Sequence, residues 1–375
     1  FVVGVTNPKT LVFFASFLVF LFLFCSELTY GLTRLEPRPR PAPVWKPVHL
    51  VWAFGFTLVF AIILVNALGI ELFMTSRVEF DLARAEAFER TIGAMIEAFA
   101  SGGAFVCLVL CLVLLRRHRY DLVSGVFLLV CLAVALVLNG IVNNPLRLAR
   151  FTLFAYTFAA LITLLPWIRH VTLRAIAITY PLLTFIASPV VNEINRIRSD
   201  SRDIGTFVSD LRLSEGPLSP DFADFQFIIM SLEYVREHGL AFGRYVLTTV
   251  FFFVPRSIWE GKAVSASNDI AAANNYNFIN VSSPPLTEFY LDIGIIGVVL
   301  CGIGIGAFGR FLDSRIRQTP PSAVSYIVLA MLIGFIPYLL RGSLLSVVSW
   351  VAGFVMLPLA IAVAERWRRV PRLRR

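Results

Sequence analysis

The chain carries a short segment in which two cations and a tryptophan directly follow an apolar run. The segment reads FFFVPRSIWEGK and occupies residues 251–262. Proline lacks an N–H and blocks the continuation of a helix, so we expect the apolar run to end at Pro255. Tryptophan favours the boundary between membrane and water. Arg256 and Lys262 then lie at that boundary, suited to hold the phosphates of a lipid-linked substrate that Trp259 also contacts. The alternative is that these side chains only anchor a helix end.

A second pair of cations, Arg147 and Arg150, follows another apolar run in the segment NNPLRLAR. Residues three apart share a helix face if both belong to the first turn of the next helix. Guanidinium groups contact phosphate through paired hydrogen bonds, which lysine does not form. We therefore expect this pair to bind a substrate phosphate. The alternative is that both side chains lie at the headgroup level as anchors.

Two more ionisable residues, Arg341 and Glu288, lie next to apolar runs. Arg341 separates two runs with almost no loop between them, and ionisable groups at such depth are typically functional. Pro337 predicts a kinked helix end that directs Arg341 inward. Glu288 follows a proline pair and falls in the first turn of the next helix, near its positive dipole end. We expect it to act as a general base or as an arginine partner. A solvated first-turn glutamate and an interfacial Arg341 are the alternatives.

Other polar residues give weaker signals. Asp221 and Asp224 flank a predicted amphipathic helix, where we expect them to cap it, or else to contact sugar hydroxyls. The five cysteines all fall in apolar runs and indicate small core side chains. Gly302, Gly304 and Gly306 indicate close helix packing, not a phosphate loop. Signatures of serine hydrolases, zinc peptidases and nucleotide-binding loops are missing from the sequence, so we expect neither a metal nor a cofactor.

The composition identifies a membrane protein. Of 375 residues, 58% are hydrophobic, and the mean hydropathy is +0.78. A soluble domain is not able to bury this much apolar surface. The net charge of +9 comes mainly from arginine. Nucleic-acid binding would need a soluble basic domain, and we find none in the sequence. The charge is better explained as a topology signal and as attraction to anionic membrane lipid.

We predict an all-α, polytopic bundle of transmembrane helices that forms one domain over residues 1–375. About 20 apolar residues are needed to cross a membrane. Nine segments meet this requirement: 10–31, 49–73, 93–115, 121–142, 151–168, 173–190, 286–308, 323–341 and 344–364.

Arginines in the short loops predict the orientation of these spans. If the nine spans alternate, the basic loops 32–48, 116–119 and 309–322 and the C-terminal tail all fall on one side. Short cytoplasmic loops carry an excess of Lys and Arg, so this side is predicted to be cytoplasmic. The N-terminus then starts outside, and we expect at least one further span before Phe1.

The loop 191–285 is predicted to be extracytoplasmic and is unusually long. Residues 225–237 predict an amphipathic helix, and residues 240–254 form a second apolar piece. Both pieces are short for full spans. We therefore predict a re-entrant or interfacial helical hairpin over 225–256 that lines a cavity. Two tilted full spans are the alternative. The expected apolar stripe of the first helix consists of Phe225, Ile228, Ile229, Leu232 and Val235.

These segments resemble bacterial O-antigen polymerases of the Wzy type, also described as oligosaccharide repeat-unit polymerases. Residues 252–262 are close to the family pattern FFxPRxxWxxKP, although Ala263 stands where the pattern has proline. Residues 285–297 are similar to the family run P-x-x-E-x-Y-x-x-x-G-x-x-G. Asn144-Pro145 with Arg150, and Arg341-Gly342, look like two further family positions. The similarity covers about residues 140–345, and RX10G motifs are not evident.

The resemblance implies a membrane glycosyltransferase that uses undecaprenyl-pyrophosphate-linked oligosaccharides as donor and acceptor. It implies an active site on the periplasmic face of the bacterial inner membrane, no nucleotide sugar and no cofactor, and a chain-length regulator protein as a partner. The site residues we assign are Arg256, Glu288 and Arg341 for catalysis, and Arg147, Arg150, Trp259, Lys262, Asp221 and Asp224 for substrate binding. A flippase for the same lipid-linked sugar and a transferase related to O-antigen ligases are the competing functions.

Overall fold

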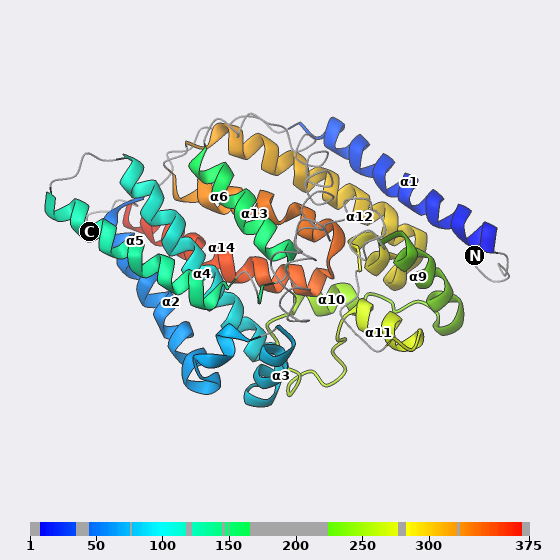
Figure 1. Ribbon diagram of the computed structural model, residues 1–375. Helices are drawn as coiled ribbons and strands as arrows, with labels where there is room; N and C mark the ends of the chain where they lie inside the picture. Colours follow the sequence, from blue (N-terminus) through cyan, green and yellow to red (C-terminus); the bar gives the residue numbers. More distant parts are fainter. Residues whose placement is uncertain are drawn as a thin grey trace, which may run out of the picture.

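The computed structural model of the chain is a helical bundle (Figure 1). The structure describes residues 8–34, 45–75, 77–117, 122–144, 147–148, 150–165, 224–276, 283–320 and 323–369. Within these ranges, the regular elements are helices. This agrees with the all-α class that the sequence predicts.

Seven of the described helices are long and apolar enough to cross a membrane. Each matches a predicted span, so the multi-pass membrane character is confirmed. The predicted span 151–168 corresponds to a shorter apolar helix, α6 (Arg150–Leu164). The predicted span 173–190 lies outside the described residues, so the total of nine stays a prediction. The seven are α1 (Pro8–Leu32), α2 (Pro47–Leu68), α4 (Arg90–Arg117), α5 (Leu122–Val142), α12 (Pro285–Gln318), α13 (Val324–Arg341) and α14 (Leu344–Arg369).

Close backbone approaches hold these spans together at small residues. A side chain on Gly306 or Gly302 of α12 would collide with Ser26 or Phe22 of α1. The packing role predicted for these two glycines is therefore confirmed. Gly304 differs, because open space surrounds it. Small residues serve this purpose in membranes because van der Waals packing, not the hydrophobic effect, drives helix association there. The same arrangement recurs where α4 meets α14 at Gly102 and Gly353, and where α6 meets α13 at Ala155 and Gly334.

Contacts between the spans define two ends of the bundle. At the first end, Lys46 reaches Glu365, Arg116 reaches the Leu164 carbonyl, and Arg310 reaches the Thr33 carbonyl. We call this the basic end, because the arginine-rich loops adjoin it in sequence. At the opposite end, Asn144 contacts Phe73, Arg147 contacts Glu97, and Leu344 contacts Glu288. The described spans thus alternate in direction as the charge pattern predicts.

Short helices cover the second end, which we call the site end. They are the 3₁₀ turn η1 (Glu71–Met74), α3 (Arg77–Ala87), α9 (Asp224–His238), α10 (Arg244–Val250) and α11 (Ala266–Ala273). In Figure 1, α9 lies beside the start of α1, and α10 lies next to the start of α14. Helices α9, α10 and α11 belong to the predicted loop 191–285, of which residues 224–276 are described before α12 begins.

Helix α9 confirms the amphipathic helix predicted over 225–237, but its buried face differs from the predicted stripe. Phe227 and Met230 are buried, whereas Phe225 is exposed. The reason is that α9 packs against α1, α12 and α11 together, so a wider face is covered. Ile228 and Leu232 are buried as expected.

The second predicted piece, 240–254, is only partly helical. Helix α10 occupies Arg244–Val250, and residues 251–254 form turns. Phe242 and Gly243 adopt positive φ angles, which ends any continuous helix before α10 begins. Helix α10 packs against α12 and α14, and its Tyr245 joins Phe227 of α9 in one apolar cluster. Whether this unit enters the membrane stays a prediction.

Candidate functional site

The segment after α10 folds into turns that we call the PRSIW loop, residues 251–263. The Arg256 guanidinium donates to the carbonyls of Lys262 and Ala263 at 2.8 and 2.7 Å. The Lys262 ammonium donates in return to two carbonyls at the start of the loop, both at 2.7 Å. The two cations therefore tie the ends of the loop together and fix its shape. The accepting carbonyls at the start belong to Phe252 and Val254.

The two cations of the PRSIW loop differ in access. Arg256 is half-buried, whereas Lys262 is 3% exposed. A guanidinium has five N–H donors and an ammonium three, so both groups keep donors beyond these bonds. Burial and the neighbouring Arg256 charge lower the pKa of Lys262, while the Glu89 carboxylate raises it. Of the two predicted phosphate-binding groups, Arg256 is therefore the accessible one, and Lys262 supports the loop from beneath.

Glu89, just before α4, brings a second segment to the PRSIW loop. Its carboxylate accepts from the Thr91 and Ile92 N–H groups at 3.0 and 3.1 Å. Burial raises the pKa of Glu89. These N–H groups and the N–H of Arg256 together lower it by more, so the pKa of Glu89 lies below its usual range. An ionised carboxylate thus lies beside the Arg256 backbone N–H and favours the charged form of Lys262. The sequence analysis missed Glu89.

An apolar surface surrounds the loop. Trp259 is half-buried, and its ring lies 6.4 Å from that of Phe251 in an edge arrangement. A surface with this many exposed apolar side chains is typical of one that meets lipid or a partner. Trp259 in this setting agrees with the expected position at a membrane boundary. The exposed apolar side chains of α10 and the loop are Leu247, Val250, Phe251, Phe253 and Ile258.

Glu288 occupies the first turn of α12, as predicted, and is 1% exposed. Its carboxylate accepts the N–H of Leu344 at 3.2 Å, at the start of α14. The hydroxyls of Ser283 and Ser343 lie next to this carboxylate, but neither completes a hydrogen bond of good geometry. Glu288 therefore holds the short connection between α13 and α14, and the alternative of a solvated first-turn glutamate is wrong.

Arg341 is the last residue of α13 and forms an ion pair with Asp224, the first residue of α9. Arg341 Nε lies 3.5 Å from Asp224 Oδ1, and 17% of the arginine side chain is exposed. The sequence analysis assigned both residues to the site. They lie 117 positions apart in the chain, and the fold brings them together. Asp224 takes the arginine as its partner, so it is not simply a helix cap. Glu288 holds Leu344, three residues after Arg341, and so fixes the connection that follows this arginine.

A break in α12 joins this cluster to α10, and the sequence analysis missed it. Ile293 and Gly294 have non-helical backbone angles, and Gly294 has φ +66°, which favours glycine. The Asp292 carboxylate is 1% exposed and accepts the N–H groups of Tyr245 and Val246 at 3.0 and 2.8 Å. An acid deep in an apolar run, two residues before a glycine, was the available signal. Asp292 thus fixes the start of α10.

Arg147 lies in a different environment from the one predicted. It is in the turn before α6, which begins at Arg150, so the two arginines do not share a helix face. Arg147 is 3% exposed, lies 2.7 Å from Glu97 and lies over the Phe80 ring at 3.9 Å. Arg84 of α3 also pairs with Glu97. This buried arrangement makes Arg147 a support of the site end.

Glu97 could have been found from sequence, because a lone acid in an apolar span calls for a partner.

Two predicted binding residues remain without a structural description. Asp221 lies outside the described residues, as does the side chain of Arg150. In the described part of the chain, no group of three His, Cys, Asp or Glu side chains is arranged to hold a metal ion.

The site end therefore gathers three units: the PRSIW loop with Glu89, the Glu288–Arg341–Asp224 cluster, and the Arg147–Glu97–Arg84 support. The first two offer partly exposed guanidinium groups, which suit an anionic ligand such as a pyrophosphate. Comparison of the chain with protein-family models, curated proteins and solved structures finds no match.

Proposed function

We propose that this chain is a membrane glycosyltransferase that polymerises undecaprenyl-pyrophosphate-linked oligosaccharide repeat units on the periplasmic face of the bacterial inner membrane. One observation carries the proposal. Segments far apart in sequence bring Arg256 and Arg341 to the end of the bundle opposite the basic end. An enzyme that works on one side of a membrane needs its charged groups gathered there, next to an apolar surface that receives the lipid chain. The resemblance of the PRSIW loop supplies the reaction class.

In this reaction, an acceptor sugar hydroxyl attacks the anomeric carbon of the donor sugar. The bond between that carbon and the pyrophosphate oxygen breaks, and the oxygen keeps the electron pair. The leaving group gains negative charge, which fixed cationic donors stabilise most when they are already in place. Arg256, fixed by its two carbonyl bonds, and Arg341, fixed by Asp224, meet this requirement. The acceptor hydroxyl proton leaves to a base.

Two roles were expected for Glu288, and the geometry favours orienting the arginine over acting as the base. Its carboxylate is buried and already accepts the Leu344 N–H. Glu288→Gln keeps an acceptor oxygen for that N–H but removes the basic carboxylate. If Glu288 positions Arg341, Glu288→Gln retains polymerisation and Glu288→Ala loses it. Loss of polymer in both variants, with normal folding, would assign the base role instead.

The proposal is tested in cells by Arg256→Ala and Arg341→Ala. Each variant is expected to abolish long polysaccharide chains while single repeats persist on the lipid carrier. Arg236→Ala on α9 is a matched control, because this arginine is partly exposed and lies on the same covering helix unit. Full-length polymer in both test variants at normal protein levels would refute the proposal.

A transporter for the same lipid-linked sugar is the second candidate, and the break in α12 favours it. Discontinuous spans form substrate sites in many transporters. Here the break is occupied by the chain itself, because the Leu291 and Asp292 carbonyls accept the N–H groups of Ala241 and Phe242 at 2.8 and 2.9 Å. The two functions separate when purified protein receives lipid-linked repeats: a polymerase makes new glycosidic bonds, and a flippase only moves the lipid.

A further inference from the structure

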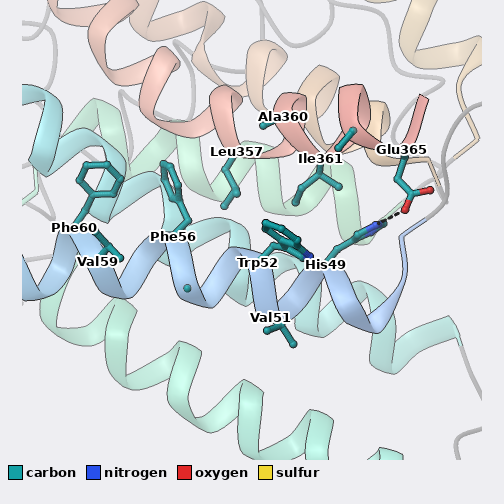
Figure 2. A pocket seen from close by; sticks show the side chains of 12 residues that line it. His49, Val51, Trp52, Phe56, Val59, Phe60, Leu357, Ala360, Ile361 and Glu365 are labelled. Carbon is teal, nitrogen blue, oxygen red and sulfur yellow. Dashed lines mark hydrogen bonds and ion pairs between the residues drawn. The ribbon is translucent and has the colours of Figure 1, made fainter. Parts of the chain in front are cut away.

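A hollow opens between α2 and α14 at the basic end, away from the candidate site. Its volume is about 740 Å³, within the range of roughly 300–1,000 Å³ typical of small-molecule sites. Small residues contribute to its lining, Gly55 on α2 and Ala360 and Ala364 on α14. Figure 2 shows aromatic side chains of α2 along one side and Leu357 and Ile361 of α14 along the other. The walls are therefore apolar.

The length of the hollow matches one leaflet of a membrane. On α2 its lining runs from His49 to Phe60. At 1.5 Å per residue this distance is about 16 Å, and half of a hydrocarbon core of about 30 Å is about 15 Å. The polar residues lie at the outer limit of the span, and the apolar lining continues towards the membrane centre. An acyl chain fits this polarity, since its headgroup remains at the boundary.

The polar limit of the hollow suits an anionic headgroup. Glu365 is 4% exposed and is held by His49 at 3.1 Å and by Lys46 at 3.2 Å, as Figure 2 shows for the histidine. The acid is thus compensated by Lys46, whose side chain is still 53% exposed. The end of α14, directly after Glu365, adds further positive charge in Arg366, Arg368 and Arg369.

We propose that this hollow binds one anionic phospholipid of the leaflet at the basic end. One acyl chain lies between α2 and α14, and the phosphate lies beside Lys46. The charge at the boundary selects an anionic headgroup over a zwitterionic one, and the single-leaflet length selects a phospholipid over a long polyprenyl chain. This inference is independent of the proposed function, because the hollow lies at the other end of the bundle.

The test uses the full chain in phosphatidylcholine nanodiscs that contain a phosphatidylglycerol probe with a diazirine on its acyl chain. Cross-linked peptides are mapped by mass spectrometry, and we expect labelling at Trp52 and Phe56. Gly55→Phe adds a ring at the lining of the hollow without a collision, because no atom lies within 4 Å of a Cβ built there. It is expected to reduce labelling at least fivefold. Val130→Phe on α5, a lipid-exposed position away from the hollow, is the control and leaves labelling unchanged.

The headgroup is tested by Lys46→Met, which is expected to lower phosphatidylglycerol labelling about fivefold, the effect of one cation near a charged membrane surface. Unlabelled phosphatidylglycerol should compete with the probe better than phosphatidylcholine. The proposal is overturned if Gly55→Phe and Val130→Phe reduce labelling equally, if phosphatidylcholine competes as well as phosphatidylglycerol, or if a polyprenyl phosphate competes better than both.

Discussion

Replacing Arg147 with methionine keeps a long side chain but removes a positive charge from a buried site. Arg147 Nη1 lies 2.7 Å from Glu97, and the two residues are 3% and 5% exposed. Removing one partner of a buried ion pair leaves the other charge uncompensated and costs about 3–5 kcal/mol. Arg84 still contacts Glu97, so we expect a value near the lower limit, about 3 kcal/mol.

A double variant separates the pair from the rest of the site. When Glu97→Gln is added to Arg147→Met, a neutral amide replaces the buried carboxylate, so the charge that lost its Arg147 partner is removed as well. Residues in direct contact have coupling energies of about 0.5–3 kcal/mol, so we expect the double variant to recover about 1–2 kcal/mol. Arg236→Met, at a partly exposed position, should change stability by less than about 0.5 kcal/mol.

The assay is reversible unfolding of the purified protein in mixed detergent micelles, followed by tryptophan fluorescence and read together with polymer length in cells. The structure predicts that polymer falls in parallel with folded protein in Arg147→Met and returns partly in the double variant. A variant with unchanged unfolding that nevertheless makes no polymer would refute the reasoning. That result would return Arg147 to a direct phosphate-binding role.

Three further outcomes are expected. Asp292→Ala removes the acceptor for the Tyr245 N–H and should cost about 1–2 kcal/mol, as loss of a helix cap does, with faster hydrogen exchange confined to α10. Burial and Arg256 lower the pKa of Lys262, so its charge is lost as pH rises through that lowered value. Lys262→Arg stays protonated and should extend polymerisation to higher pH; an unchanged alkaline limb would contradict this. Gly306→Val should weaken the packing of α1 on α12, whereas Gly304→Val, in open space, should leave thermal stability unchanged.

The sequence was sufficient for the spans because the signal is local. An apolar run of about 20 residues shows where a helix crosses, and the arginine pattern shows how the crossings alternate. Seven spans followed from this alone. Helix α9 followed from its periodicity, and the packing of Gly302 and Gly306 from their size and spacing. These features depend on neighbours along the chain.

The site was harder to predict because its geometry depends on partners far apart in sequence. The sequence analysis predicted that Arg147 binds phosphate. It did not foresee the ion pair with Glu97, because that residue lies 50 positions earlier in the chain. Nothing local indicated that Lys262 would turn inward to its own loop carbonyls. The position of Asp292 in an apolar run signalled a buried acid, but not that α10 would be its partner. The partner of a buried ionic group depends on which helices meet. The periodicity of the sequence does not contain that information. Arg341 was easier to identify, because an arginine between two apolar runs is singled out by its depth in the membrane.

The central claim is that residues at the site end of the bundle catalyse the joining of lipid-linked sugar repeats. It is tested most directly by purified protein in liposomes supplied with undecaprenyl-pyrophosphate-linked repeats, with products separated by size. The wild-type protein is predicted to give a ladder of lengthening chains, and Arg256→Ala and Arg341→Ala to leave only the unextended repeat. Movement of the lipid-linked repeat between leaflets with no product longer than one repeat would contradict the claim.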